Sequence, residues 1–193
     1  LYNSRDFLQR GLDTVSYSSA VQDSIKTNVL RNVDKSMNSF IQKNMSELPS
    51  LFWEAFSSRM IIDIFKFYKN YSDNRKSIEV NFLNYENNEY SAIVVICNNR
   101  SGILKDIVQG LSFSQINILG SRIISLNNND VIDVFWVCNS AQKALKEKNE
   151  QNRLVQNLIA SVEGLEIEAV SDLLNIKSKL EVLPKITVDN KMS

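Results

Sequence analysis

The sequence predicts an α+β protein, in which an N-terminal helical arm precedes a ferredoxin-like βαββαβ sandwich with an antiparallel sheet. Up to residue 74, apolar residues recur every three or four positions, which is the spacing of amphipathic helices. After that point, strand-like apolar runs alternate with helical stripes in the order strand, helix, strand, strand, helix, strand. Two strand–helix units joined through a hairpin give a sandwich with both helices on one face of the sheet.

The predicted helical arm covers residues 1–74. Its first apolar stripe predicts one long helix that ends before Pro49, and the stripe consists of Ile25, Val29, Val33, Met37, Phe40 and Ile41. A second stripe follows, made of Leu51, Phe52, Trp53, Met60, Ile61, Ile64, Phe65 and Tyr68. We expect these aromatic side chains to lie in a core, because no polar cluster accompanies them as a cofactor pocket would need. Polar residues at 73–76 then predict a linker, and the next domain begins at residue 75.

The second domain, residues 75–182, contains the elements of the sandwich. The predicted elements are a strand at Ser91–Cys97, a helix at Gly102–Ser114, strands at Ile116–Leu126 and Val131–Cys138, a helix that ends at Gly164, and a last strand at 165–170. A hairpin-like stretch at 84–89 precedes the first strand, and the turn at 127–130 is rich in residues that tolerate positive φ. In this topology Cys97 and Cys138 end neighbouring antiparallel strands, so we expect their sulfurs at opposite ends of the sheet.

Composition excludes several kinds of function. The 193 residues include no His, which removes Ser-His-Asp triads, Cys-His pairs and His-ligated metal sites. The 22 basic and 22 acidic residues balance, so neither nucleic acid nor an anionic membrane is an expected partner. Two Cys residues, no apolar run that could span a bilayer and no signal-peptide pattern favour a cytoplasmic protein. The start at Leu1 rather than Met leads us to expect a piece of a longer chain.

The candidate functional segment is the turn at residues 98–104, between the first strand and the first helix. The start of a helix presents unpaired N–H groups and a partial positive charge, and Gly102 allows a ligand to approach the backbone closely. A carboxylate is therefore expected to lie against the N–H groups of Gly102 and Ile103. In the structural alternative, which the spacing alone favours, a polar side chain of the same turn caps the helix.

Several motifs resemble those of a known regulatory domain. The run Asn99-Arg100-Ser101-Gly102-Ile103-Leu104, the later pair Asn117-Ile118 and the strand motif Asp133-Val134-Phe135-Trp136-Val137 resemble an ACT domain, a small module that commonly senses amino acids. The strand motif is similar to the Asp-Thr-Phe-Trp-Val of the first ACT domain in bifunctional protein-PII uridylyltransferase/uridylyl-removing enzymes. Segments similar to Leu1-Tyr2, to Leu48-Pro49 with Phe52-Trp53, and to residues 183–190 occur in those enzymes in the same order.

The resemblance implies a glutamine-sensing role in nitrogen regulation. It places an HD hydrolase domain and a nucleotidyltransferase domain before residue 1, and the start of a link to a second ACT domain at 183–193. The implied ligand-binding residues are Asn99, Arg100, Ser101, Gly102, Ile103, Asn117 and Ile118. The parent enzyme would use Mg²⁺ and act on a PII signalling protein, whereas this segment is expected to hold no cofactor and no catalytic residue. Because Asn99 replaces the Asp of the motif, a charge-assisted bond to the ligand's ammonium is lost, and we expect weak glutamine binding.

Two other functions are compatible with parts of the sequence. The first is a ligand-free ACT-type interaction module that pairs with another ACT domain or with a second copy of the chain, because sheets of this kind have exposed edges. The second is an RNA-binding sheet of similar topology. It is disfavoured, because the charge is balanced and the strands lack paired exposed aromatic and basic residues.

Overall fold

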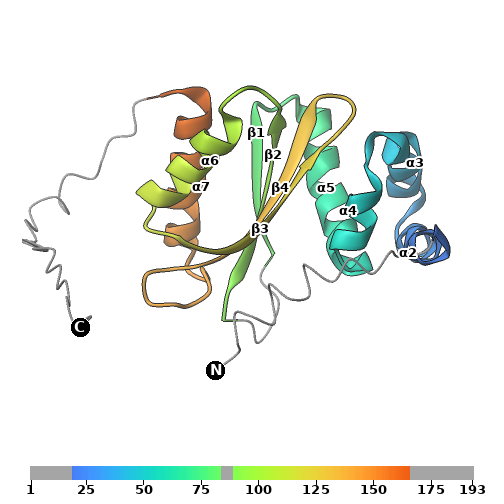
Figure 1. The fold of residues 1–193 in the computed structure, drawn as a ribbon, viewed down its shortest axis with the longest axis horizontal. Helices are drawn as coiled ribbons and strands as arrows, with labels where there is room; N and C mark the ends of the chain where they lie inside the picture. Colours follow the sequence, from blue (N-terminus) through green and yellow to red (C-terminus); the bar gives the residue numbers. More distant parts are fainter. Residues whose placement is uncertain (1–18, 84–88, 166–193) are drawn as a thin grey trace, which may run out of the picture.

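The computed structural model describes residues 19–83 and 89–165, which form three layers (Figure 1). A four-stranded antiparallel sheet lies in the middle, two helices cover one of its faces, and the N-terminal helices cover the other. The predicted α+β class, with an N-terminal helical region and a ferredoxin-like antiparallel sheet, is confirmed. Within these two ranges, no helix has the length and apolar character needed to cross a membrane.

The sheet consists of β1 (Ile78–Leu83), β2 (Ser91–Asn98), β3 (Asn117–Ser125) and β4 (Asp130–Cys138), in the spatial order β1-β2-β4-β3. Every neighbouring pair is antiparallel. The register places Cys97 opposite Val131, near the start of β4, while Cys138 ends that strand. The two thiols are buried and free, and they lie at opposite ends of the sheet, as the topology predicts.

Strand β1 is an element that the predicted order did not contain. It pairs with β2 along the edge that the last strand of a βαββαβ sandwich would occupy. The predicted last strand at 165–170 lies outside the described residues, apart from Leu165, which belongs to no strand. Glu79 interrupts the apolar pattern by which β1 could have been predicted. Its side chain is buried and accepts hydrogen bonds from Asn70 and Asn81. The hairpin-like stretch predicted at 84–89 joins β1 to β2, and residues 84–88 of it lie outside the described part.

The helical layer contains α2 (Ser19–Arg31), α3 (Lys35–Asn44), a 3₁₀ turn η1 (Met45–Glu47), α4 (Ser50–Ala55) and α5 (Ser58–Asn74). The prediction of one long helix before Pro49 is wrong, because the chain breaks between α2 and α3. Asp34 adopts an extended conformation there, and its side chain accepts the N–H of Met37 at 2.9 Å. The apolar stripe continues through the break because residues of both helices pack against the same core. A residue that favours the N-cap position, here Asp34, within a continuous apolar stripe therefore indicates that one helix ends and another begins.

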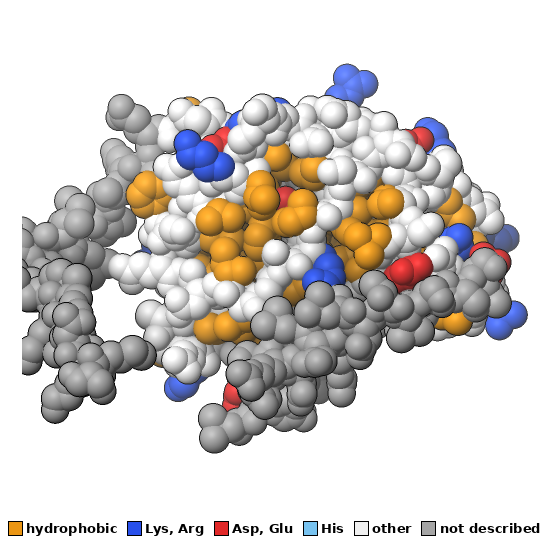
Figure 2. Space-filling model, in the orientation of Figure 1, with side chains coloured by type: hydrophobic (Ala, Val, Ile, Leu, Met, Phe, Trp, Pro, Cys, Tyr) orange, Lys and Arg blue, Asp and Glu red, His pale blue; other side chains and the backbone are white. Residues whose placement is uncertain are grey.

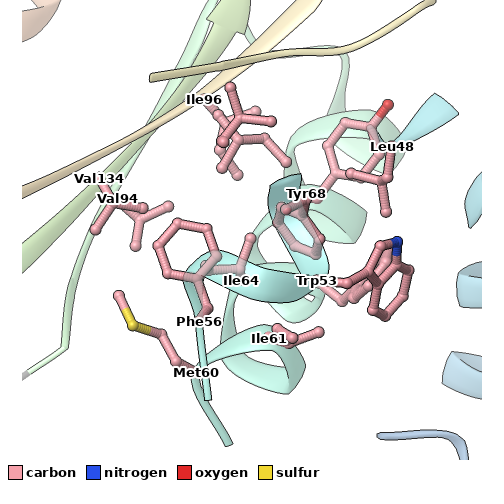
Figure 3. Close-up of a cluster of buried hydrophobic side chains, with 14 of the residues drawn as sticks. Leu48, Trp53, Phe56, Met60, Ile61, Ile64, Tyr68, Val94, Ile96 and Val134 are labelled. Atoms are coloured by element: carbon pink, nitrogen blue, oxygen red, sulfur yellow. The ribbon is translucent and has the colours of Figure 1, made fainter. Parts of the chain in front are cut away.

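The helical region is a layer on the sheet rather than an arm. Side chains of α4, α5 and the preceding turn pack against Val94 and Ile96 of β2 and Val134 of β4, in one buried cluster (Figure 3). The predicted placement of the aromatic residues in a core is confirmed, and Phe52, Trp53 and Phe65 are fully buried. The predicted linker at 73–76 is partly helical, because α5 extends to Asn74 and Arg75 ends it in the left-handed region at φ 48°.

The second face of the sheet is covered by α6 (Ile103–Phe113) and α7 (Lys148–Glu163), close to their predicted positions. The two helices pack tightly on each other at Gly110, where an added Cβ would lie 3.0 Å from the Cα of Leu158. Gly164 ends α7 with φ 68°, as predicted. The β2–α6 turn, which holds the candidate functional segment, lies at the end of the sheet where α7 also ends, since Arg100 contacts the carbonyl of Val162.

Candidate functional site

The β2–α6 turn has a backbone arrangement that limits its use as a carboxylate cradle. Gly102 precedes α6 with φ 82°, a backbone conformation that favours glycine. The space around it is open, because an added Cβ would meet no atom within 4 Å. The N–H of Ile103 donates to the carbonyl of Arg100 at 3.1 Å, so it is already used within the turn. Among the described residues no side chain caps α6, so the alternative in which a polar side chain of this turn caps the helix is wrong.

Arg100 connects this turn to the C-terminal end of α7 by a hydrogen bond. Its Nη2 donates to the carbonyl of Val162 at 2.6 Å and lies 2.7 Å from Oδ2 of Asp106, while Nη1 donates to the carbonyl of Ser101 at 3.3 Å. A cation at the C-terminal end of a helix is favourable because the helix dipole is negative there. The guanidinium is thus engaged in contacts within the protein, and Arg100 is an anchor of the turn.

The predicted site residues form two separate groups. Asn99, Arg100, Ser101, Gly102 and Ile103 lie together in the β2–α6 turn, next to the start of β4. Asn117 and Ile118 lie at the opposite end of β4, because Asn117 pairs with Cys138. Nine residues of β4 separate the two ends, a distance of about 26 Å at the rise of an extended strand. A single small ligand therefore cannot contact both groups within one chain.

An exposed apolar surface, which the sequence analysis did not identify, lies on β3 and α6. It consists of Leu104, Val108, Ile118, Leu119 and Ile123, which are between 37% and 54% exposed, and we call it the β3–α6 surface. Figure 2 shows hydrophobic side chains gathered over this part of the molecule.

The register and the helix geometry explain why four of these side chains neighbour one another, whereas Leu119 lies in a β-bulge of the same strand. Ile118 and Ile123 pair with Val137 and Asp133 of β4, and Val137 belongs to the core under α6 and α7, so both isoleucines project on the α6 side. On α6, positions 104 and 108 lie on the side opposite to positions 106 and 110, which contact α7. Leu104 and Val108 therefore face the β3 edge of the sheet.

Strand β3 is also an open sheet edge within the described part of the chain. It pairs with β4 alone, so one row of its backbone N–H and C=O groups has no strand partner there. A β-bulge between Ile118 and Gly120 interrupts the pairing near its start. An edge strand with large apolar side chains is a surface to which another strand can be added.

Asp133 is a buried carboxyl group beneath this surface. It is 1% exposed, it pairs with Ile123 in the sheet register, and its Oδ1 has no hydrogen-bond partner in the described structure. Burial raises the pKa of Asp133 to about 7, and a hydrogen bond from the backbone of Ile124 opposes this rise. Its neighbours on the same face of β4, Val131 and Phe135, belong to the apolar core.

Two surface hollows lie away from the predicted site. One of about 570 Å³ is lined by residues of α2 and by Ser58, and another of about 230 Å³ lies between β1 and α7. Across residues 19–83 and 89–165, no group of three or more acidic or thiol side chains is placed to hold a metal ion. Neither hollow includes a residue of the β2–α6 turn or of β3.

No protein-family model matches the chain, and a comparison with curated proteins finds no match either. The β3–α6 surface and the β2–α6 turn are the two features of the described residues that bear on function.

Proposed function

We propose that this chain is an ACT-type regulatory module that acts by association, and that its β3 edge pairs with the β3 edge of a second copy. The observation that carries the proposal is the β3–α6 surface, five exposed apolar side chains beside an open strand edge. Such a surface gives a partner both main-chain hydrogen bonds and apolar contacts. A second domain of the same fold in a longer polypeptide would offer an equivalent edge.

The expected affinity follows from the exposed area. Each of the five side chains is 37–54% exposed, so covering it contributes about 1 kcal/mol. This gives roughly 5 kcal/mol for each copy, or about 10 kcal/mol for the two copies of the pair. The hydrogen bonds between the strands add to this, and the loss of translational and rotational freedom opposes it. We therefore expect weak, reversible self-association, in the micromolar range or above.

Sedimentation velocity over a range of concentrations tests this proposal. Ile123→Glu introduces a charge into the surface, and it should abolish self-association. Val21→Glu is a matched control on α2, a helix that packs on α4 and α5, because Val21 is 38% exposed and Ile123 is 39% exposed. The wild type and Val21→Glu should associate alike. A monomeric wild type at the highest attainable concentration, or unchanged association in Ile123→Glu, would contradict the proposal.

A second function, glutamine sensing as part of a cytoplasmic protein-PII uridylyltransferase/uridylyl-removing enzyme, is proposed from the motif resemblance. One structural observation favours a ligand at the β2–α6 turn: among the described side chains none caps α6, so apart from the N–H of Ile103 the first-turn N–H groups have no side-chain acceptor and attract an anion. Calorimetric titration with glutamine tests this role. We expect weak binding by the wild type and tighter binding by Asn99→Asp, since a carboxylate at position 99 pairs with the ammonium. Equal binding by both forms would contradict it.

A further inference from the structure

The β3–β4 turn, residues 127–130, connects three parts of the fold. The side chain of Asn127 donates to the carbonyl of Ser46 in the 3₁₀ turn at 2.8 Å. Asn128 and Asp130 contact α5, and Asn129 contacts the β2–α6 turn. A hairpin turn usually faces water, whereas each residue of this turn holds a neighbouring element.

On the helical side, two tyrosines of α5 bind one carboxylate. The hydroxyl of Tyr68 donates to Oδ2 of Asp130 at 3.2 Å, and that of Tyr71 donates to Oδ1 at 3.3 Å. Nδ2 of Asn128 donates to the hydroxyl of Tyr68 at 2.7 Å. Burial raises the pKa of Tyr68 to about 12, and burial together with the Asp130 charge raises the pKa of Tyr71 further. Both hydroxyls therefore remain protonated donors at any physiological pH.

On the other side, Asn129 holds the start of the β2–α6 turn by backbone and side chain. Its carbonyl accepts the N–H of Asn99 at 2.7 Å and Nδ2 of Asn98 at 3.1 Å. Its own Nδ2 donates to the carbonyl of Asn99 at 3.1 Å. Asn129 has φ 69°, a left-handed conformation that Asn tolerates better than most residues. The order of Asn99 thus depends on the position of this one turn.

We propose that the β3–β4 turn is a mechanical coupler, through which the packing of α5 controls the order of the β2–α6 turn. The hydrogen bonds that carry this coupling exist without any ligand or partner. The further role of the coupler, reporting a ligand in the β2–α6 turn to the helical layer, rests on the glutamine-sensing function proposed above. Coupling between two sites is reciprocal, so ordering the turn would also strengthen its hold on α5.

Amide hydrogen exchange, measured by NMR on the whole chain, tests the coupling. The double variant Tyr68→Phe/Tyr71→Phe removes both hydroxyls and preserves the rings. We expect exchange at the N–H of Asn99 to accelerate by about tenfold, because local opening becomes easier. Exchange at Val94 and Val95, in the centre of the buried strand β2, should remain unchanged. Tyr71→Phe alone tests the same link, with a smaller effect, if the double variant does not fold.

A matched control separates coupling from the general effect of losing a tyrosine hydroxyl. Tyr90→Phe makes the same chemical change at the other end of β2, beside Ser91, and should leave Asn99 exchange unchanged. Unchanged exchange at Asn99 in the α5 variants would overturn the proposal. Equal acceleration at Asn99 and throughout β2 would also overturn it, because the tyrosines would then contribute only global stability. Since no ligand or second copy takes part, failure here leaves the sedimentation and calorimetric tests of function unaffected.

Discussion

Replacing the buried carboxyl group by an amide in Asp133→Asn should change how stability depends on pH. The folded-state pKa of Asp133 is about 7, against an ordinary value of 3.8. Between these two values the folded chain holds a proton that the unfolded chain has released. The free energy of unfolding therefore falls as pH rises through this range, and the loss is complete above the folded-state pKa.

The size of the effect follows from the two pKa values. Their difference corresponds to about 4 kcal/mol over the full range, since one pKa unit is 1.36 kcal/mol. Between about pH 5.5 and pH 8.5, where the protein is easier to handle, the wild type should lose about 2 kcal/mol through this group. The amide side chain of the variant cannot ionise, so this part of the pH dependence disappears.

Urea denaturation followed by circular dichroism at both pH values measures this difference. The comparison uses the change in the free energy of unfolding with pH in each protein. The unpaired N–H of the buried amide lowers the stability of the variant by the same amount at both pH values, so it does not affect this change. Other titrating groups contribute equally to both proteins, and they cancel in the difference. Parallel pH dependence in the wild type and Asp133→Asn would refute the reasoning, since it would show that Asp133 reaches water or a cation in the folded chain.

Three other predictions concern stability and organisation. Gly110→Ala should lower the free energy of unfolding by about 1–3 kcal/mol in urea titration, because the added Cβ would press on Leu158. This cost exceeds the gain from the higher helix propensity of alanine, and a more stable variant would contradict the prediction. Gly102→Ala should cost about 1 kcal/mol in the same assay, from its φ of 82° alone, and an unchanged midpoint would contradict it. A fragment that begins at residue 75 should aggregate or unfold, as seen by gel filtration and circular dichroism, because removing α5 exposes Val94 and Ile96; a soluble folded monomer would contradict this.

The elements that the sequence predicted well are those with a strong local period. The stripes of α6 and α7 and the apolar runs of β2 and β4 appear close to their expected positions. The break at Asp34 was missed because an apolar stripe can continue across two helices that pack on the same core. Strand β1 was missed because Glu79 is polar, and its burial depends on an ion pair with Lys76 and on hydrogen bonds from Asn70 and Asn81.

The candidate turn shows the same limit for function. Glycine at position 102 and the helix that follows it were predictable, because positive φ and helix starts are local properties. The engagement of Arg100 by Val162 and of Asn99 by Asn129 was not, because these partners are 62 and 30 residues away along the chain.

The sequence by itself determined the class of the fold, the placement of Cys97 and Cys138 at opposite ends of the sheet and the apolar character of the aromatic stripe, since each follows from the local periods of the elements and their order along the chain. Only the tertiary structure decided that the N-terminal helices cover the face of the sheet opposite to α6 and α7, that Asn99 and Asn117 lie at opposite ends of β4, and that an apolar surface remains on β3 and α6. The physical reason is that exposure and proximity depend on which elements pack together, and each element's local pattern is compatible with several such packings.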